Sequence, residues 1–225
     1  MLRAILFDFD GTIARSEPIH FAAFAEVLAE RGLVLDAAAY YERYVGLTDR
    51  ECFERTVEDF GRPDLRAALP ALLAEKAAAM AAHLDHGVPL CAGVAAFVAA
   101  AATRAPLAIV SGALRAEIAR VLERENLAGF FPIVVSAEDV RAGKPDPQGY
   151  RLAVDRLRAL SLADLAPNEC LAIEDTPSGI AAARAAGLRV VALPHTLRAE
   201  ALAGADRVYA SYDRIPWADL DALFA

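Results

Sequence analysis

The stretch ILFDFDGTIARSEPIH at residues 5–20 decides how the N-terminal part of the chain is interpreted. An apolar run typical of a buried strand is interrupted by Asp8 and Asp10 and then ends at a glycine and a threonine. Residues two apart in a strand point the same way, so both carboxylates can face one place while Phe9 packs inside. Because like charges repel and each costs free energy to bury, we expect a positive partner or a reactive role at this point.

The rest of the chain after residue 87 alternates short aliphatic runs with longer helical stretches, which predicts a parallel sheet flanked by helices. The expected strands are residues 4–9, 107–111, 132–136, 170–174, 189–193 and 207–210. The expected helices are residues 93–104, 113–126, 147–160 and 177–186. This pattern predicts an α/β fold with a doubly wound, Rossmann-like parallel sheet.

Residues 15–86 contain no convincing strand and instead form a succession of helical segments. These segments are residues 17–32, 37–46, 48–61 and 64–84, and each of the first three ends at a glycine. We therefore expect an inserted all-helical domain, 15–86, and an α/β core made of 1–14 plus 87–225, with hinges near the two junctions.

Composition and charge restrict the classes of function. The 23 basic and 31 acidic residues give a net charge of -8, and no basic block is dense enough to follow a nucleic acid backbone. The N-terminal apolar run meets aspartates too early for a signal peptide, and no apolar stretch reaches about 18 residues, so no membrane partner is expected. Cys52, Cys91 and Cys170 lack paired spacing, which suits the cytoplasm. We expect a monomer or small homo-oligomer.

Polar residues recur where the expected strands end, which is where open α/β sheets bind ligands. Ser111-Gly112 follows the second strand, Lys144 lies in AGKPDP after the third, and Glu174-Asp175 ends the fourth. Clustered carboxylates without histidine or cysteine fit a hard cation such as Mg²⁺, and Lys144 would offset their charge. Each feature alone has a simpler reading as a helix cap, a turn or a solvated lysine, and only their coincidence favours a site.

These residues resemble the haloacid dehalogenase superfamily of phosphotransferases, in its branch with a helical cap like that of β-phosphoglucomutase. The similarity rests on DFDGT, VSG, GKPDP and IEDTPSGI, in that order, together with DGTIARSEPIH. It implies that Asp8 is the nucleophile, that Asp10 is the general acid and base, and that Ser111 and Lys144 orient the transferring group. It also implies a Mg²⁺ site formed by Asp8, the Asp10 carbonyl, Asp175 and Glu174, the last directly or through water.

The remaining candidates concern the substrate. We expect the phosphate group of the substrate to be contacted by Gly11, Thr12 and Gly112. In the helical insert, His20, Arg50 and Lys76 could reach the substrate, although a packed histidine and solvated cations are the simpler readings. The other three histidines, His83, His86 and His195, have no partner spacing and are not assigned to the site.

The leading hypothesis is a Mg²⁺-dependent phosphatase that acts on a small phosphorylated metabolite, with a sugar phosphate as the expected substrate, through a phosphoaspartate. A phosphosugar mutase needs the same core and would be recognised by a bisphosphate intermediate. A 2-haloacid dehalogenase needs neither Asp10 nor Asp175, so both residues argue against it. A non-catalytic metabolite-binding module would be expected to have lost at least one of the reactive residues.

Overall fold

The computed structural model describes residues 1–160 and 162–225 and divides the chain into two compact units. One unit comprises Met1–Arg15 and Pro89–Ala225, and the other comprises Ser16–Val88. The junctions fall one and two residues after those expected from the sequence.

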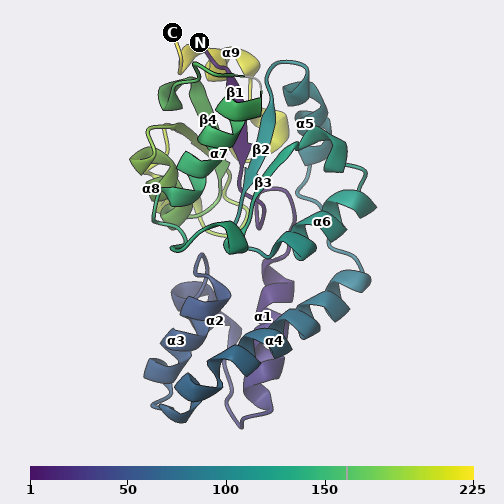
Figure 1. Cartoon of the computed structure of the whole chain (residues 1–225), viewed down its shortest axis with the longest axis vertical. Coiled ribbons are helices and arrows are strands. Elements are labelled where there is room, and N and C mark those ends of the chain that lie inside the picture. The colour runs from purple at the N-terminus through teal and green to yellow at the C-terminus, as the bar shows by residue number, and fades with distance from the viewer. Residues whose placement is uncertain (161) are drawn as a thin grey trace. The chain divides into compact units, whose positions relative to one another are not determined.

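The first unit contains a six-stranded parallel sheet in the order β3-β2-β1-β4-β5-β6 (Figure 1). The strands are β1 (Ala4–Phe7), β2 (Leu107–Val110), β3 (Ile133–Val135), β4 (Cys170–Glu174), β5 (Arg189–Ala192) and β6 (Arg207–Val208). Helices cover both faces of this sheet, so the prediction of a doubly wound, Rossmann-like core is confirmed.

The central strand β1 is apolar throughout because it is covered on both faces. Leu6 packs in a cluster with residues of helices α7 and α8, while Phe7 contacts Phe97 of α5 and Phe131, with ring centroids 6.2 and 5.6 Å apart. The helices of this unit are α5 (Val94–Ala102), α6 (Arg115–Arg124), α7 (Gln148–Leu160), α8 (Pro177–Ala185) and α9 (Trp217–Ala222). The 3₁₀ helices are η1 (Ala128–Phe130), η2 (Ala137–Asp139), η3 (Pro167–Glu169), η4 (Ala199–Leu202) and η5 (Tyr212–Arg214).

The second unit is helical and has its own core. Its helices are α1 (Glu17–Ala29), α2 (Ala37–Arg43), α3 (Asp49–Asp59) and α4 (Asp64–Asp85). Local signals fix where two of them begin, because Asp36 accepts a hydrogen bond from the Ala39 amide before α2 and Thr48 forms a capping box before α3. The core contains a group of aromatic rings, in which the ring centroids of Phe24 and Phe53 lie 4.6 Å apart. None of the helices among the described residues is both long and apolar enough to cross a membrane.

Candidate active site

The strand order reverses direction between β1 and β4, which creates the kind of crevice where open α/β sheets bind ligands. Asp8 directly follows β1, Ser111 directly follows β2, and Glu174 is the last residue of β4. Backbone hydrogen bonds continue the sheet past the strand ends, from the Asp8 amide to the Ile173 carbonyl and from the Ser111 amide to the Val135 carbonyl, both 2.9 Å long. The sheet itself therefore brings these side chains to one edge.

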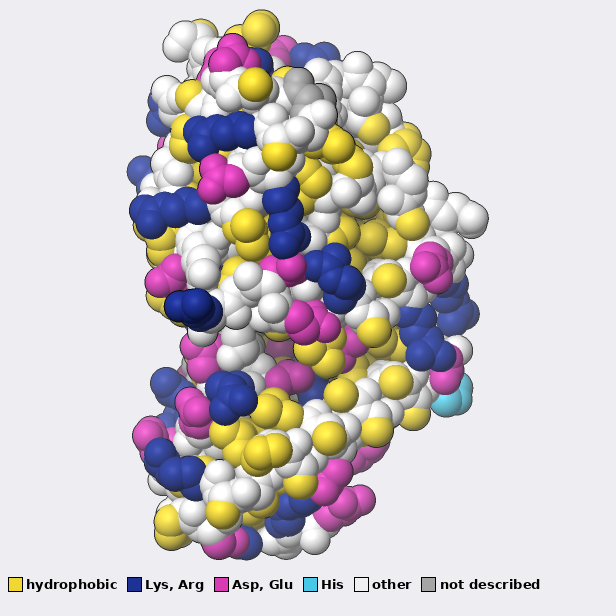
Figure 2. All heavy atoms as spheres, viewed as in Figure 1, with side chains coloured by type: hydrophobic (Ala, Val, Ile, Leu, Met, Phe, Trp, Pro, Cys, Tyr) yellow, Lys and Arg dark blue, Asp and Glu magenta, His cyan; other side chains and the backbone are white. Residues whose placement is uncertain are grey.

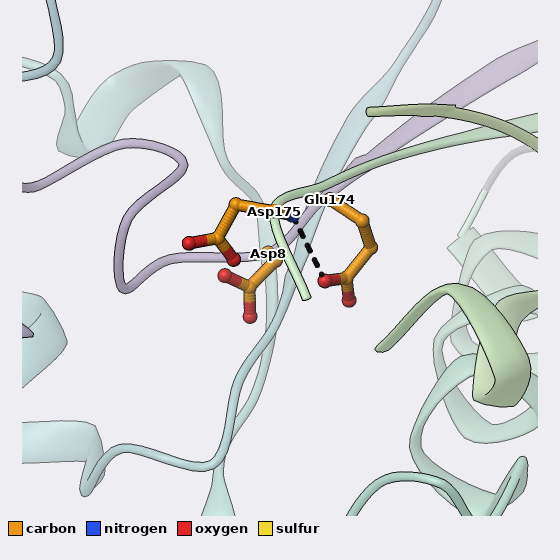
Figure 3. A group of neighbouring side chains, drawn as sticks. All are labelled: Asp8, Glu174 and Asp175. Atoms are coloured by element: carbon orange, nitrogen blue, oxygen red, sulfur yellow. Dashed lines mark hydrogen bonds between the residues drawn. The ribbon is translucent and has the colours of Figure 1, made fainter. Parts of the chain in front are cut away.

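Three carboxylates lie together at this edge, from Asp8, Glu174 and Asp175 (Figure 3). Their side chains belong to buried residues, exposed by 6%, 0% and 1%, and one oxygen from each lies within 4.8 Å of the others. Buried carboxylates at such short separations repel one another strongly unless a cation offsets them. An all-oxygen donor set of this kind fits Mg²⁺, which prefers carboxylates and phosphate oxygens.

Lys144 supplies a fixed positive charge to the cluster. Its Nζ lies 2.5 Å from Oδ1 of Asp8 and 2.6 Å from Oε1 of Glu174. Oε1 of Glu174 also accepts a 2.6 Å hydrogen bond from the Tyr150 hydroxyl. Burial raises the pKa of Asp8, Lys144 opposes this shift, and Glu174 and Asp10 add to it. Burial alone would lower the pKa of Lys144, but Asp8 and Glu174 together raise it. The lysine is thus held in its charged form beside the carboxylates.

Asp10 and Ser111 face each other across the ends of β1 and β2. The Ser111 hydroxyl lies 3.3 Å from Oδ2 of Asp10, to which it donates, and its oxygen accepts a 2.9 Å hydrogen bond from the Ala113 amide. The neighbouring Gly112 is exposed, and a Cβ built on it would meet nothing within 4 Å. This side of the edge is open to an approaching group.

The turn after Asp10 is crowded on its other side. Gly11 has a positive φ of 74°, and a Cβ there would lie 1.9 Å from Oδ2 of Asp175 and 2.2 Å from Oγ1 of Thr196, so only glycine fits. Thr12, expected to contact phosphate, is fully buried, and its hydroxyl oxygen has no hydrogen-bond partner among the described residues. Because the Thr12 side chain is buried inside the α/β unit, it packs within the turn that follows Asp10.

The helical unit brings together two of the three candidates that it carries. Lys76 is 1% exposed, its Nζ lies 2.8 Å from Nδ1 of His20, and it forms a 2.8 Å ion pair with Asp49. Arg50 is exposed, and its guanidinium lies 4.0 Å from the Glu54 carboxylate one turn along α3. Lys76 is therefore not the solvated lysine of the simpler reading, and Asp49 is a partner that the sequence did not indicate.

Two side chains near the site were missed by sequence reasoning. Tyr150 comes from α7 and donates to Glu174, and His195 comes from the segment after β5 and contacts the Gly11 carbonyl with Nδ1 at 2.9 Å. His195, which the sequence left unassigned, thus lies against the turn that follows Asp10. Its place just beyond the end of a parallel strand was the signal that could have identified it.

Comparisons with known proteins define the class. A model of haloacid dehalogenase-like hydrolases matches residues 2–187. The validoxylamine A 7'-phosphate phosphatase of Streptomyces hygroscopicus subsp. limoneus is 30% identical over 96% of this chain and 97% of its own length. The fructose-1-phosphate phosphatase YqaB of Escherichia coli is 32% identical over 83% and 94%. A structure of a CbbY mutant from Rhodobacter sphaeroides in complex with xylulose-(1,5)bisphosphate superposes with a TM-score of 0.80, at 28% identity over 94% and 95%.

The chain therefore belongs to the haloacid dehalogenase-like hydrolase family. The family and the enzyme class predicted from the sequence, a hydrolase of phosphate monoesters, are confirmed by these matches.

Proposed function

We propose that the protein is a Mg²⁺-dependent phosphatase that hydrolyses a small sugar phosphate through a phosphoaspartate formed on Asp8. The observation that carries this proposal is the position of Asp8: its buried carboxylate follows the central strand, contacts Lys144 and lies beside the carboxylates of Glu174 and Asp175. A nucleophile in this position can approach a phosphoryl group whose negative charge is balanced by neighbouring cations.

In the first step an oxygen of Asp8 attacks phosphorus, and the bond between phosphorus and the ester oxygen breaks. Asp10, in its protonated form, gives its proton to the departing oxygen, so that an alcohol and not an alkoxide leaves. Ser111, whose hydroxyl already contacts Asp10, and the charged Lys144 orient the transferring group.

In the second step water hydrolyses the phosphoaspartate. Asp10, now a carboxylate, takes a proton from the water while its oxygen attacks phosphorus, which frees Asp8 and releases inorganic phosphate. The same group thus serves as acid and then as base, and the cycle ends with each aspartate in its starting form.

The metal site is proposed at Asp8, Asp175 and the Asp10 carbonyl, with Glu174 as a direct or water-mediated ligand. When bound there, Mg²⁺ would lower the repulsion between the carboxylates and the incoming phosphate. Oε1 of Glu174 already accepts hydrogen bonds from Lys144 and Tyr150, which favours the water-mediated role for that oxygen.

The helical unit is proposed as a cap that selects the substrate, with His20, Lys76 and Arg50 as candidates to contact the part of the substrate that leaves. A sugar phosphate is proposed because relatives are named for fructose 1-phosphate and for validoxylamine A 7'-phosphate. On the face shown in Figure 2, basic and acidic side chains are interspersed. The three cysteines are free, in keeping with the cytoplasm as the proposed location.

The proposal is tested by measuring phosphate release from a panel of sugar phosphates, with Mg²⁺ or with chelator, for the wild type and for Asp8→Asn and Asp10→Asn. We expect Mg²⁺-dependent release that is lost in Asp8→Asn and lowered roughly 10²- to 10⁴-fold in Asp10→Asn. Release by Asp8→Asn at the wild-type rate would remove the nucleophile assignment. Isomerised sugar phosphate without phosphate release would instead identify a mutase.

A further inference from the structure

The turn that follows Asp10 is held at nearly every backbone polar group. The Gly11 amide donates to the Ala14 carbonyl at 2.7 Å, and the Gly11 carbonyl accepts from Nδ1 of His195 at 2.9 Å and from Sγ of Cys91 at 3.3 Å. One residue further on, the Thr12 carbonyl accepts a 3.0 Å hydrogen bond from the hydroxyl of Tyr212. The peptide groups next to Asp10 therefore have little freedom to rotate.

His195 differs from the other two donors in its origin and exposure. Cys91 and Tyr212 are buried, whereas His195 is partly exposed and belongs to the segment that leaves β5. That segment is itself anchored to the site, because the Leu193 amide donates to the Glu174 carbonyl at 2.9 Å and the His195 amide donates to the Leu193 carbonyl at 2.9 Å. The histidine thus links the end of β4 to the turn after β1.

The direction of this hydrogen bond follows from chemistry. A carbonyl oxygen only accepts, so Nδ1 of His195 carries the hydrogen. Burial lowers the pKa of His195, and Arg15 lowers it further, while the hydrogen bond to the Gly11 carbonyl opposes this shift. The ring is therefore neutral near pH 7, with its hydrogen on Nδ1. The contact needs no change of protonation in order to persist.

We propose that His195 is a positioning residue for Asp10, which it holds in the orientation for proton transfer by fixing the Gly11 carbonyl. The inference rests on the proposed function, because it assumes that Asp10 protonates the leaving group. The ring does not touch the reacting atoms in this scheme, and its effect passes through the peptide that follows Asp10. A general acid displaced by about 1 Å loses much of its contribution to the rate.

The leaving group provides a test that a merely structural role would not pass. Phenyl phosphate and 4-nitrophenyl phosphate have similar sizes, but 4-nitrophenoxide departs readily without a proton, whereas phenoxide needs one more. Because kcat/KM reports the steps up to formation of the phosphoaspartate, a misplaced Asp10 should lower it mainly for phenyl phosphate. Asp10→Asn measured on both esters provides the reference for complete loss of the acid.

Two substitutions separate the hydrogen bond from the bulk of the ring. His195→Phe keeps a ring near Tyr212 and removes the donor, while the amide nitrogen of His195→Asn can take the place of Nδ1. We expect His195→Phe to lower kcat/KM about tenfold for phenyl phosphate and less than about threefold for 4-nitrophenyl phosphate, with His195→Asn restoring most of the loss. His86→Phe is the matched control, because Nδ1 of His86 also lies at hydrogen-bond distance, 3.0 Å, from a backbone carbonyl, that of Ala82.

Melting temperatures are measured for all variants to check that each is folded at the assay temperature. Three outcomes would overturn the positioning role and leave the proposed function standing. They are equal losses of kcat/KM on both esters, no loss in His195→Phe, and a His195→Asn variant as impaired as His195→Phe. A wild-type enzyme that cleaves neither ester with Mg²⁺ would overturn the proposed function and this inference with it.

Discussion

At the scale of single residues, the site is a set of charges that depend on one another. Burial, Glu174 and Asp10 raise the pKa of Asp8, and Asp8 and Glu174 in turn raise the pKa of Lys144. Each buried carboxylate is tolerated because the lysine, hydrogen-bond donors or a bound cation offsets its charge. Replacing one member should therefore change the stability of the site as well as its chemistry.

Asp8→Asn is the first substitution that separates these two effects. It should lower turnover by roughly 10³-fold or more, because an amide is not a nucleophile of comparable strength. The metal-free melting temperature should stay the same or rise, since a buried carboxylate is removed while Lys144 keeps Glu174 as a partner. Differential scanning calorimetry with and without Mg²⁺ should show a stabilisation by the metal that the variant lacks.

The control for this substitution is Asp219→Asn, whose exposed carboxylate accepts a 2.8 Å hydrogen bond from the Tyr209 hydroxyl. It should leave turnover and the response to Mg²⁺ unchanged. An Asp8→Asn variant that melts well below the wild type without metal would mean that the ion pair with Lys144 contributes more than the buried charge costs.

The sequence predicts the positions of residues that follow from the sheet, but not of those that follow from tertiary packing. Asp8, Ser111 and Glu174 could be placed together because parallel strand ends meet at one edge. Tyr150 reaches Glu174 only because of how α7 is rotated on the sheet, and rotation is not encoded in a local pattern. The path of the segment that carries His195 was equally beyond prediction from spacing.

At the scale of elements, the first turn of α8 fits around the carboxylate of Glu174. The helix begins with Thr176 as its N-cap, whose hydroxyl accepts from the Gly179 amide at 3.2 Å. A Cβ built on Gly179 would lie 2.0–2.1 Å from the Glu174 carboxylate atoms, so the glycine makes room for that side chain. The start of this helix and the position of Glu174 are therefore coupled.

Gly179→Ala tests this coupling. Alanine normally favours a helix over glycine by about 0.5–1 kcal/mol, so propensity alone predicts a small gain in stability. We expect a loss of stability and of activity instead, because the Glu174 carboxylate must move and its hydrogen bonds with Lys144 and Tyr150 must weaken. Urea denaturation and steady-state kinetics measure both effects.

Gly129→Ala is the matched control, because a Cβ there would meet nothing within 4 Å. Its stability and activity should stay close to those of the wild type. A stabilised and fully active Gly179→Ala variant would show that Glu174 can shift without consequence.

The connection between β3 and α7 depends on a second carboxylate, Asp139 at the end of η2. It accepts hydrogen bonds from the Ser136 amide and hydroxyl, both 2.9 Å, and from Arg156 at 2.6 Å, and it also pairs with Arg115. Burial alone would raise the pKa of Asp139, but these donors hold it well below the usual value. The ionised form is therefore the one that the fold binds.

The sign of the pH effect follows from this lowered pKa. The charged carboxylate contributes stability above the pKa of the unfolded chain, about 4, and the contribution is lost as the pH falls through the lower pKa of the folded state. Asp139→Asn should cost about 1 kcal/mol at pH 7, a modest value because solvent screens part of the cluster. The difference from the wild type should shrink towards acid pH, as measured by urea denaturation between pH 3 and pH 7. Asp155→Asn, which removes an exposed pair with Arg158, should show little difference at any pH.

At the scale of the whole molecule, the chain forms two units with separate hydrophobic cores. The helical unit is an insertion whose two ends are joined at its root, because the Arg15 amide donates to the Pro89 carbonyl at 2.8 Å and the Cys91 amide donates to the Ile13 carbonyl at 2.9 Å. All four of these residues belong to the α/β unit. The α/β unit is thus closed by its own hydrogen bonds where the insertion begins and ends.

Phe53→Ala tests whether the two units unfold separately. Phe53 is fully buried in the helical core, and its loss should destabilise that unit by about 3–5 kcal/mol. An unfolded insertion costs the α/β unit little, since the free energy of closing a long loop grows only with the logarithm of its length. Hydrogen exchange should therefore show α1 to α4 exchanging early in the variant while β1 and β4 stay protected, and thermal unfolding should separate into two transitions.

Val34→Ala, at an exposed position of the same unit, should leave the exchange pattern unchanged. Loss of protection in both units at once would show that the insertion and the α/β unit unfold as one cooperative body.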